Sequence, residues 1–158
     1  WPPFAQTILV LLMFVGGCSG STAGSIKCGR ILLLLRSSTR SLLRLSHPRA
    51  VRVVKLDGKV VDEETLRTVS SFFLCFFALL GVGCLVVSLD GYSLTTSFTA
   101  ALGCLSNVGP GLDLVGPMGN FGLLSGFNKV FLSLLMLIGR LEIFPILLLF
   151  LPSTWRRS

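Results

Sequence analysis

Charged residues are scarce in this sequence. They make up 13% of its 158 residues, against roughly 25% in a soluble domain, and the mean hydropathy is +0.83. No lysine or arginine occurs between Thr68 and Asn128. This composition excludes an ordinary soluble domain and indicates a polytopic membrane protein, with the lipid bilayer as its first partner. An initiator methionine and a basic signal-peptide region are also lacking, so we expect a fragment of a longer chain.

Residues that carry catalysis or bind metals are few. His47 is the only histidine, and the five cysteines show no Cys-x-x-Cys spacing, which argues against a metal site or a disulfide framework. There are no paired catalytic carboxylates and no Ser/His pair in the apolar segments. The Gly/Ser-rich run at residues 16–25 lacks the Lys-Ser/Thr of a phosphate-binding loop and the second glycine of a nucleophile elbow. The sequence therefore predicts a protein that is not an enzyme and has no cofactor.

The net charge of +7 is unevenly distributed, because most basic residues fall within residues 27–67. The positive-inside bias places residues 27–67 and the C-terminus in the cytoplasm. Arg36, Arg40 and Arg44 share one face of an expected helix, which suits anionic lipid headgroups; an acidic docking partner stays open. No nucleic acid partner is expected, because the basic block adjoins apolar segments and has no interleaved aromatic residues.

The chain is organised around the loop at residues 105–111, Leu-Ser-Asn-Val-Gly-Pro-Gly. We expect a membrane span at residues 68–89 and a short helix at residues 94–103 before this loop, and a second span at residues 123–151 after it. Non-helical backbone at membrane depth must be buried in protein or line a watery path. Residues 68–158 are therefore predicted to form a membrane-pore-membrane repeat with a re-entrant pore loop.

Individual residues of this loop suit ion coordination. Backbone carbonyls can replace the hydration shell of an ion, and Gly109 can adopt the positive φ that turns a carbonyl inward. The partly negative end of the short helix points to Asn107 and favours a cation there. Asp113 is the one charge just beyond the loop; it either attracts cations or is simply solvated.

Residues 1–45 are expected to form a broken membrane helix with a basic cytoplasmic extension. The apolar run at residues 4–15 would cover about 18 Å at the helical rise, roughly half a bilayer. Residues 16–27, rich in glycine and hydroxyl groups, do not favour a stable helix in hydrocarbon, so an intramembrane loop is predicted there. The alternative is close helix packing, since Gly16, Gly20 and Gly24 have the Gly-x-x-x-Gly spacing.

Residues 46–67 are expected to form a cytoplasmic connector. Short alternating segments flank Asp57-Gly58, which is a strong signal for a β-hairpin. The predicted fold is thus all-α, apart from this small cytoplasmic hairpin.

The last apolar run carries two charges, Arg140 and Glu142. A charge at membrane depth costs several kcal/mol, so such residues face a cavity or a partner. Two positions apart on a helix, the two side chains do not face each other. Arg140 therefore needs another partner, either the carbonyls and hydroxyls of the loop at residues 16–25 or a carboxylate outside this sequence.

Four motifs in order resemble the membrane subunit of Trk/Ktr-type potassium transporters. They are Gly16-Gly-Cys-Ser-Gly-Ser-Thr-Ala-Gly24 with Ile26-Lys27, His47-Pro48-Arg49-Ala50, Asn107-Val-Gly-Pro-Gly111 and Gly139-Arg-Leu-Glu-Ile-Phe144. In that family four membrane-pore-membrane repeats surround one pore, and this chain matches the end of the third repeat and all of the fourth. One departure is Ser25, where a further glycine is usual.

The resemblance implies a role for each motif. The filter strand would comprise Ser106, Asn107, Val108 and Gly109, with K+ held by the carbonyls of the last three. The gate would comprise Gly16, Gly17, Gly20, Ser21, Thr22, Gly24 and Arg140. The resemblance also implies a homodimer, a cytoplasmic nucleotide-binding regulatory subunit and the bacterial inner (plasma) membrane. Because the other three filter strands are absent, this chain needs the remainder of its own protein to form a pore. The alternative is a membrane scaffold that transports nothing.

Overall fold

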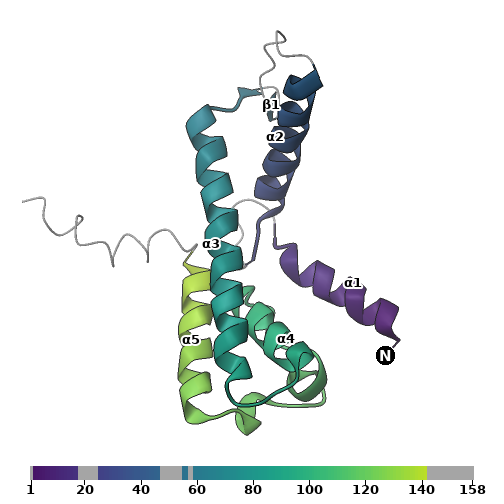
Figure 1. Cartoon of the computed structure of the whole chain (residues 1–158), viewed down its shortest axis with the longest axis vertical. Coiled ribbons are helices and arrows are strands. Elements are labelled where there is room, and N and C mark those ends of the chain that lie inside the picture. The colour runs from purple at the N-terminus through teal and green to yellow at the C-terminus, as the bar shows by residue number, and fades with distance from the viewer. Residues whose placement is uncertain (1, 18–24, 47–54, 57–58, 142–158) are drawn as a thin grey trace, which may run out of the picture.

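The computed structural model describes residues 2–17, 25–46, 55–56 and 59–141, and these residues are mostly helical (Figure 1). Several residues singled out above lie outside the described residues: Gly20, Ser21, Thr22, Gly24, the His47–Ala50 motif, Asp57-Gly58, Glu142 and the rest of the chain to Ser158. Side chains of residues 44–46, 55–56 and 59–60 are also outside the description.

Helix α3 (Glu63–Ser88) is the longest element of the described chain. Asp62 caps its start by accepting a hydrogen bond from the Glu63 N–H (2.9 Å), and the acidic first turn suits the helix dipole. Among the described residues it is the one helix long and apolar enough to cross a membrane. Its buried residues recur every three or four positions and so form one stripe: Leu66, Val69, Phe72, Phe76, Leu80, Gly83 and Val87.

The short helix α4 (Leu94–Leu105) lies at the centre of the fold and ends two residues beyond the expected bound. It packs against both α3 and α5 (Gly126–Arg140), and these two helices stand side by side in Figure 1. Gly83 of α3 permits the close approach, because a Cβ there would lie 3.1 Å from both the Ala101 Cβ and a Leu135 methyl. Helix α4 is thus packed closely against both of these helices.

The last apolar run begins differently from the expected span at residue 123. Residues Phe121–Leu123 form a 3-10 turn (η2), and α5 starts only at Gly126. The reason is a cap: the Ser125 hydroxyl accepts a hydrogen bond from the Asn128 N–H at 3.3 Å. Helix α5 is described as far as Arg140, followed by its cap Leu141.

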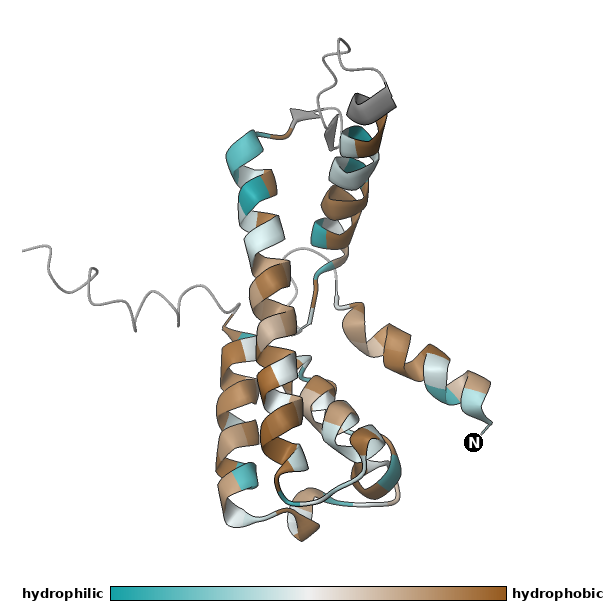
Figure 2. Ribbon diagram, viewed as in Figure 1, coloured by the Kyte–Doolittle hydropathy of each residue, from teal (hydrophilic) through white to brown (hydrophobic). Residues whose placement is uncertain are grey.

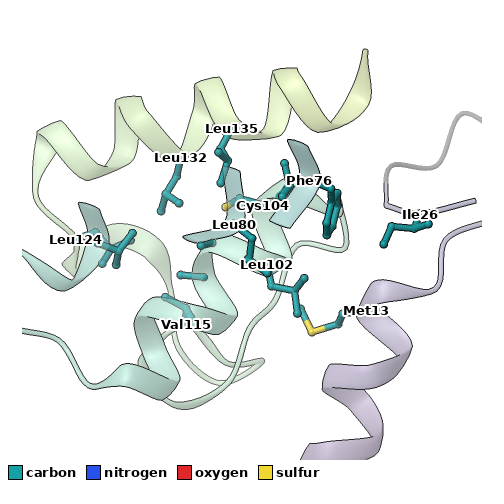
Figure 3. Close-up of a cluster of buried hydrophobic side chains, with 14 of the residues drawn as sticks. Met13, Ile26, Phe76, Leu80, Leu102, Cys104, Val115, Leu124, Leu132 and Leu135 are labelled. Carbon is teal, nitrogen blue, oxygen red and sulfur yellow. The ribbon is translucent and has the colours of Figure 1, made fainter. Parts of the chain in front are cut away.

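The N-terminal part consists of α1 (Pro3–Phe14) and α2 (Cys28–Ser46). Met13 of α1 reaches the core of α3, α4 and α5 beside Leu102 (Figure 3). Helix α2 packs on α3, where Arg40 pairs with Glu63 at 2.6 Å and the Arg30 guanidinium lies 4.2 Å from the Phe72 ring centre. Figure 2 shows hydrophilic residues on α2, among apolar ones, and on the first turns of α3, while the rest of α3 and most of α5 are hydrophobic.

Two short strands follow α2, β1 (Lys55–Leu56) and β2 (Lys59–Val60). They pair antiparallel, with Lys55 opposite Val60 and Leu56 opposite Lys59. This pairing is the geometry of a tight hairpin, whose turn residues lie outside the described chain.

Candidate functional site

The segment predicted to be a filter strand (residues 106–109, called the filter strand below) wraps back onto the end of α4. The Asn107 N–H donates to the Cys104 carbonyl (3.1 Å), and the Val108 N–H donates to the Gly103 carbonyl (3.0 Å). These bonds satisfy carbonyls that the end of a helix otherwise leaves unpaired. Within the part of the chain that the structure describes, no hydrogen bond reaches the carbonyl oxygens of residues 106–109. The N–H groups of Asn107 and Val108 thus bond to α4, and the carbonyl oxygens of the loop accept no hydrogen bond from the described residues.

Two residues of the filter strand have positive φ. Gly109 has φ +101°, which confirms the prediction for this glycine, and Asn107 has φ +55°, which the sequence analysis missed. A signal was available, because asparagine adopts the left-handed region more readily than most residues. Gly103 makes room for the strand: a Cβ there would lie 3.2 Å from the Gly109 oxygen and 3.4 Å from the Pro110 oxygen.

Burial separates the four predicted filter residues. Ser106 is only 3% exposed and faces the interior, and its hydroxyl has no hydrogen-bond partner among the described residues. Val108 is 47% exposed, while Asn107 and Gly109 are half-buried. The accessible stretch of the strand is thus Asn107 to Gly109, and the Ser106 side chain points away from it.

The Asn107 side chain ties the strand to α5. Its amide nitrogen donates to the Met136 carbonyl at 3.1 Å. Nearby, a Cβ on Gly139 would overlap the Leu105 carbonyl oxygen and would lie 2.9 Å from the Leu105 carbonyl carbon. The filter strand is therefore seated on α4 and on the last turns of α5.

Asp113, at the mouth of the loop, is anchored to the start of α4. One of its carboxylate oxygens accepts hydrogen bonds from the Thr96 hydroxyl (2.7 Å) and the Ser93 hydroxyl (2.8 Å). The hydrogen bond from Thr96 and, after it, that from Ser93 lower the pKa of the exposed Asp113 carboxyl below its usual value. Asp113 begins the 3-10 turn η1 (Asp113–Val115) with φ +58°. The charge is thus fixed at the mouth rather than freely mobile.

The two ends of the predicted gate loop (residues 16–27) lie side by side. Val15 and Ile26 form a parallel bridge, and the Gly16 N–H donates to the Ile26 carbonyl at 2.9 Å. The hydroxyl of Ser25, which has φ +68°, lies 2.6 Å from the Phe14 carbonyl and 3.0 Å from the Met13 carbonyl. Ser25 thereby caps the end of α1.

Gly16 and Gly17 lie beyond α1 in irregular backbone. Helix α1 ends at Phe14, so Gly16 is not in a helix as the Gly-x-x-x-Gly packing alternative requires. The loop's remaining predicted residues lie outside the described chain.

Arg140 occupies the last position of α5 and is exposed. Gly139, its neighbour, is the residue that touches Leu105. Within the described residues the Arg140 side chain makes no hydrogen bond or ion pair, so its partner stays a prediction.

A cavity of about 670 Å³ separates α1 from the filter strand. Leu9, Leu12 and Met13 line one side, and Val108, Pro110 and Met118 line the other. Its walls are mostly apolar, with Gln6 and Asp113 as the polar exceptions.

Fold and site together define a helical membrane protein that holds an irregular, acceptor-rich loop among its own helices. The family model described as TrkH, Cation transport protein, matches residues 1–157. The chain belongs to this family of cation transport proteins, as the motifs predicted.

Similar proteins of known function support this family assignment. The chain is 38% identical over 156 residues to the Trk system potassium uptake protein TrkG of Escherichia coli K12, covering 99% of this chain and 32% of that protein. It is 39% identical over 156 residues to TrkH of Salmonella typhimurium, with the same coverage. The crystal structure of the potassium transporter TrkH from Vibrio parahaemolyticus superposes with a TM-score of 0.88 at 38% identity, over 99% of this chain and 33% of that one. The chain thus spans about a third of the length of these relatives, which are transporters of the membrane.

Proposed function

We propose that this chain is part of a potassium uptake transporter and contributes one filter strand and one gate loop. The observation that carries the proposal is the loop after α4, whose carbonyl oxygens at residues 106–109 receive no hydrogen bond within the described chain. Oxygens left free in this way can replace the water around K+. The similarity to Trk system potassium uptake proteins along the whole chain supports potassium as the ion.

In the proposed pore, K+ is cargo and is held by the carbonyls of Asn107, Val108 and Gly109. These residues form the accessible stretch of the strand. The three other strands come from the remainder of the protein. The C-terminal end of α4 adds its partial negative charge beside the ion, and Asp113 adds a fixed charge at the mouth.

The proposed gate is the loop at residues 16–27, with Gly16, Gly17, Gly20, Ser21, Thr22 and Gly24 as its flexible positions and Arg140 as an electrostatic barrier. The contacts of Ser25 with the end of α1 support a closed resting loop. The proximity of Gly139 to Leu105 supports a position of Arg140 close to the filter strand.

The wider assembly is part of the proposal. Residues 1–45, 46–67 and 68–158 act as broken helix, connector and final repeat, in a multi-pass protein of the bacterial inner membrane. Residues 27–67 and the C-terminus face the cytoplasm, in keeping with the polar surface of α2 and the start of α3 (Figure 2). We also propose a homodimer with a cytoplasmic nucleotide-binding regulatory subunit.

The test is potassium uptake by the full-length protein in cells that lack their own uptake systems. Gly109→Ala forces a side chain into φ +101°, so we expect uptake or K+ selectivity to be lost. Gly91→Ala is the matched control, because Gly91 also has a positive φ (+80°) in open space but lies outside the loop. Wild-type selectivity in Gly109→Ala would disprove the filter assignment. The Arg140→Ala variant is expected to pass ions faster than the wild-type protein, because it lacks the proposed electrostatic barrier.

A further inference from the structure

The last turn of α5 is in closer contact with the base of the filter strand than any side chain would permit. A Cβ on Gly139 would overlap the Leu105 oxygen and lie 3.1 Å from the Asn107 amide nitrogen. Leu105 and Ser106 are buried at 0% and 3% exposure, so this contact belongs to the interior of the repeat. Because Gly139 has no side chain, the backbone of α5 contacts the backbone of Leu105, directly before the filter strand.

A second contact joins the same two segments. The Asn107 amide donates to the Met136 carbonyl, which regular helix geometry also pairs with the Arg140 N–H. Asn107 is held at φ +55°, a left-handed conformation that is unfavourable for most residues with a side chain. The side-chain bond to α5 offsets part of that cost and fixes the orientation of the following peptide.

From these two contacts we propose that Gly139 and the Asn107 side chain are positioning residues that set the filter strand's placement and thereby its ion selectivity. Gly139 acts by the absence of a side chain. Asn107, whose backbone carbonyl is one of the proposed K+ ligands, acts here through its side-chain amide. This inference rests on the proposed function and goes beyond it, because it makes selectivity depend on α5.

The physical reason lies in how a carbonyl filter discriminates. Selectivity depends on the size of the cage and on the number and field of the carbonyl dipoles around the ion. Both contacts meet at residues 105–107, directly before the accessible stretch. A shift of α5 against Leu105 therefore moves the strand as a body, and it changes the distances between its carbonyls and those of the other strands of the proposed pore.

The experiment compares K+ and Na+ uptake by the full-length protein and its variants, at matched amounts of membrane-inserted protein. A Cβ in Gly139→Ala would overlap the Leu105 oxygen and must push α5 and Leu105 apart, so we expect the preference for K+ over Na+ to be reduced or lost. Gly126→Ala is the matched control on the same helix, because a Cβ there meets nothing within 4 Å. It is expected to keep the wild-type ratio.

Asn107→Gly tests the second contact without adding atoms. Glycine accepts φ +55° freely, so this variant removes the amide bond without adding backbone strain, and it decides the question if Gly139→Ala does not insert. A lowered K+ to Na+ ratio supports the inference, and a wild-type ratio in Asn107→Gly, or in an inserted Gly139→Ala, overturns it. If the unmutated protein takes up no K+, the proposed function itself fails; if it takes up K+ and the variants keep its ratio, only the positioning role fails.

Discussion

Ser25 offers a sharp test of the proposed gate, because one residue combines a strained backbone with a stabilising contact. Its φ of +68° lies in the left-handed region, which glycine adopts more readily than serine. Its hydroxyl lies within hydrogen-bond distance of the Met13 and Phe14 carbonyls. Ser25→Ala removes the contact and keeps the strain, whereas Ser25→Gly removes both.

The structure gives the expected size of each effect. Loss of the hydroxyl's net hydrogen bonding costs the resting loop about 1 kcal/mol, close to a fivefold change in the open-to-closed ratio. Release of the left-handed strain returns about 1–2 kcal/mol in the glycine variant, and the greater freedom of glycine in the open loop offsets roughly 0.5–1 kcal/mol of this gain. Ser25→Ala should therefore leak about fivefold more than wild type, while Ser25→Gly should stay close to it.

The assay is passive rubidium flux into proteoliposomes that contain the full-length protein without a regulatory partner. Ser70→Ala is the control, because it also removes a hydroxyl bonded to a backbone carbonyl (Leu66, 3.0 Å), but on α3. Equal leak in Ser25→Ala and wild type would refute the capping role of the hydroxyl. A glycine variant that leaks more than the alanine variant would refute the strain argument.

Two further predictions concern the mouth of the filter. Gly111→Ala would place a Cβ 2.7 Å from a Val115 methyl and 2.9 Å from the Thr99 hydroxyl, so we expect a loss of about 1–3 kcal/mol of stability, seen as a lower melting temperature in detergent; an unchanged melt would show that the loop relaxes. Because the pKa of Asp113 is lowered in the folded protein, its carboxylate stabilises the fold at pH values above the ordinary pKa of 3.8. This contribution is lost as the pH falls through the lowered pKa of the folded state. The stability difference between wild type and Asp113→Asn should therefore shrink on acidification, and a difference independent of pH would contradict this linkage.

The order of the elements could be predicted from the sequence, because it depends on local composition. The apolar run within α3, the short helix α4 and the Gly/Pro loop after it all stand out in hydropathy and glycine content. The positive φ of Gly109 followed from the same local reasoning. The predicted helix starts were less accurate. The last span was expected to begin at residue 123, but the Ser125 cap makes α5 begin at Gly126.

The contacts that seat the filter strand could not be predicted, because they join residues far apart in the sequence. Asn107 bonds to a carbonyl 29 positions away, and Ser25 bonds to the end of a helix 11 positions earlier. The role of Gly139 could not be predicted for the same reason. A side chain is excluded at this position only because α5 packs against the Leu105 carbonyl in the folded protein. Sequence spacing carries no information on such tertiary approaches.

One feature unites these contacts. Among the described residues, three non-glycine residues have positive φ: Ser25, Asn107 and Asp113. Each anchors its polar side chain to a different helix, namely α1, α5 and α4. Strained backbone persists only where surrounding contacts over-determine it, so these three helices set the backbone conformation at Ser25, Asn107 and Asp113. A displacement of any one helix must therefore change a loop on the proposed ion path, because the side-chain bond that holds its strained residue moves with the helix.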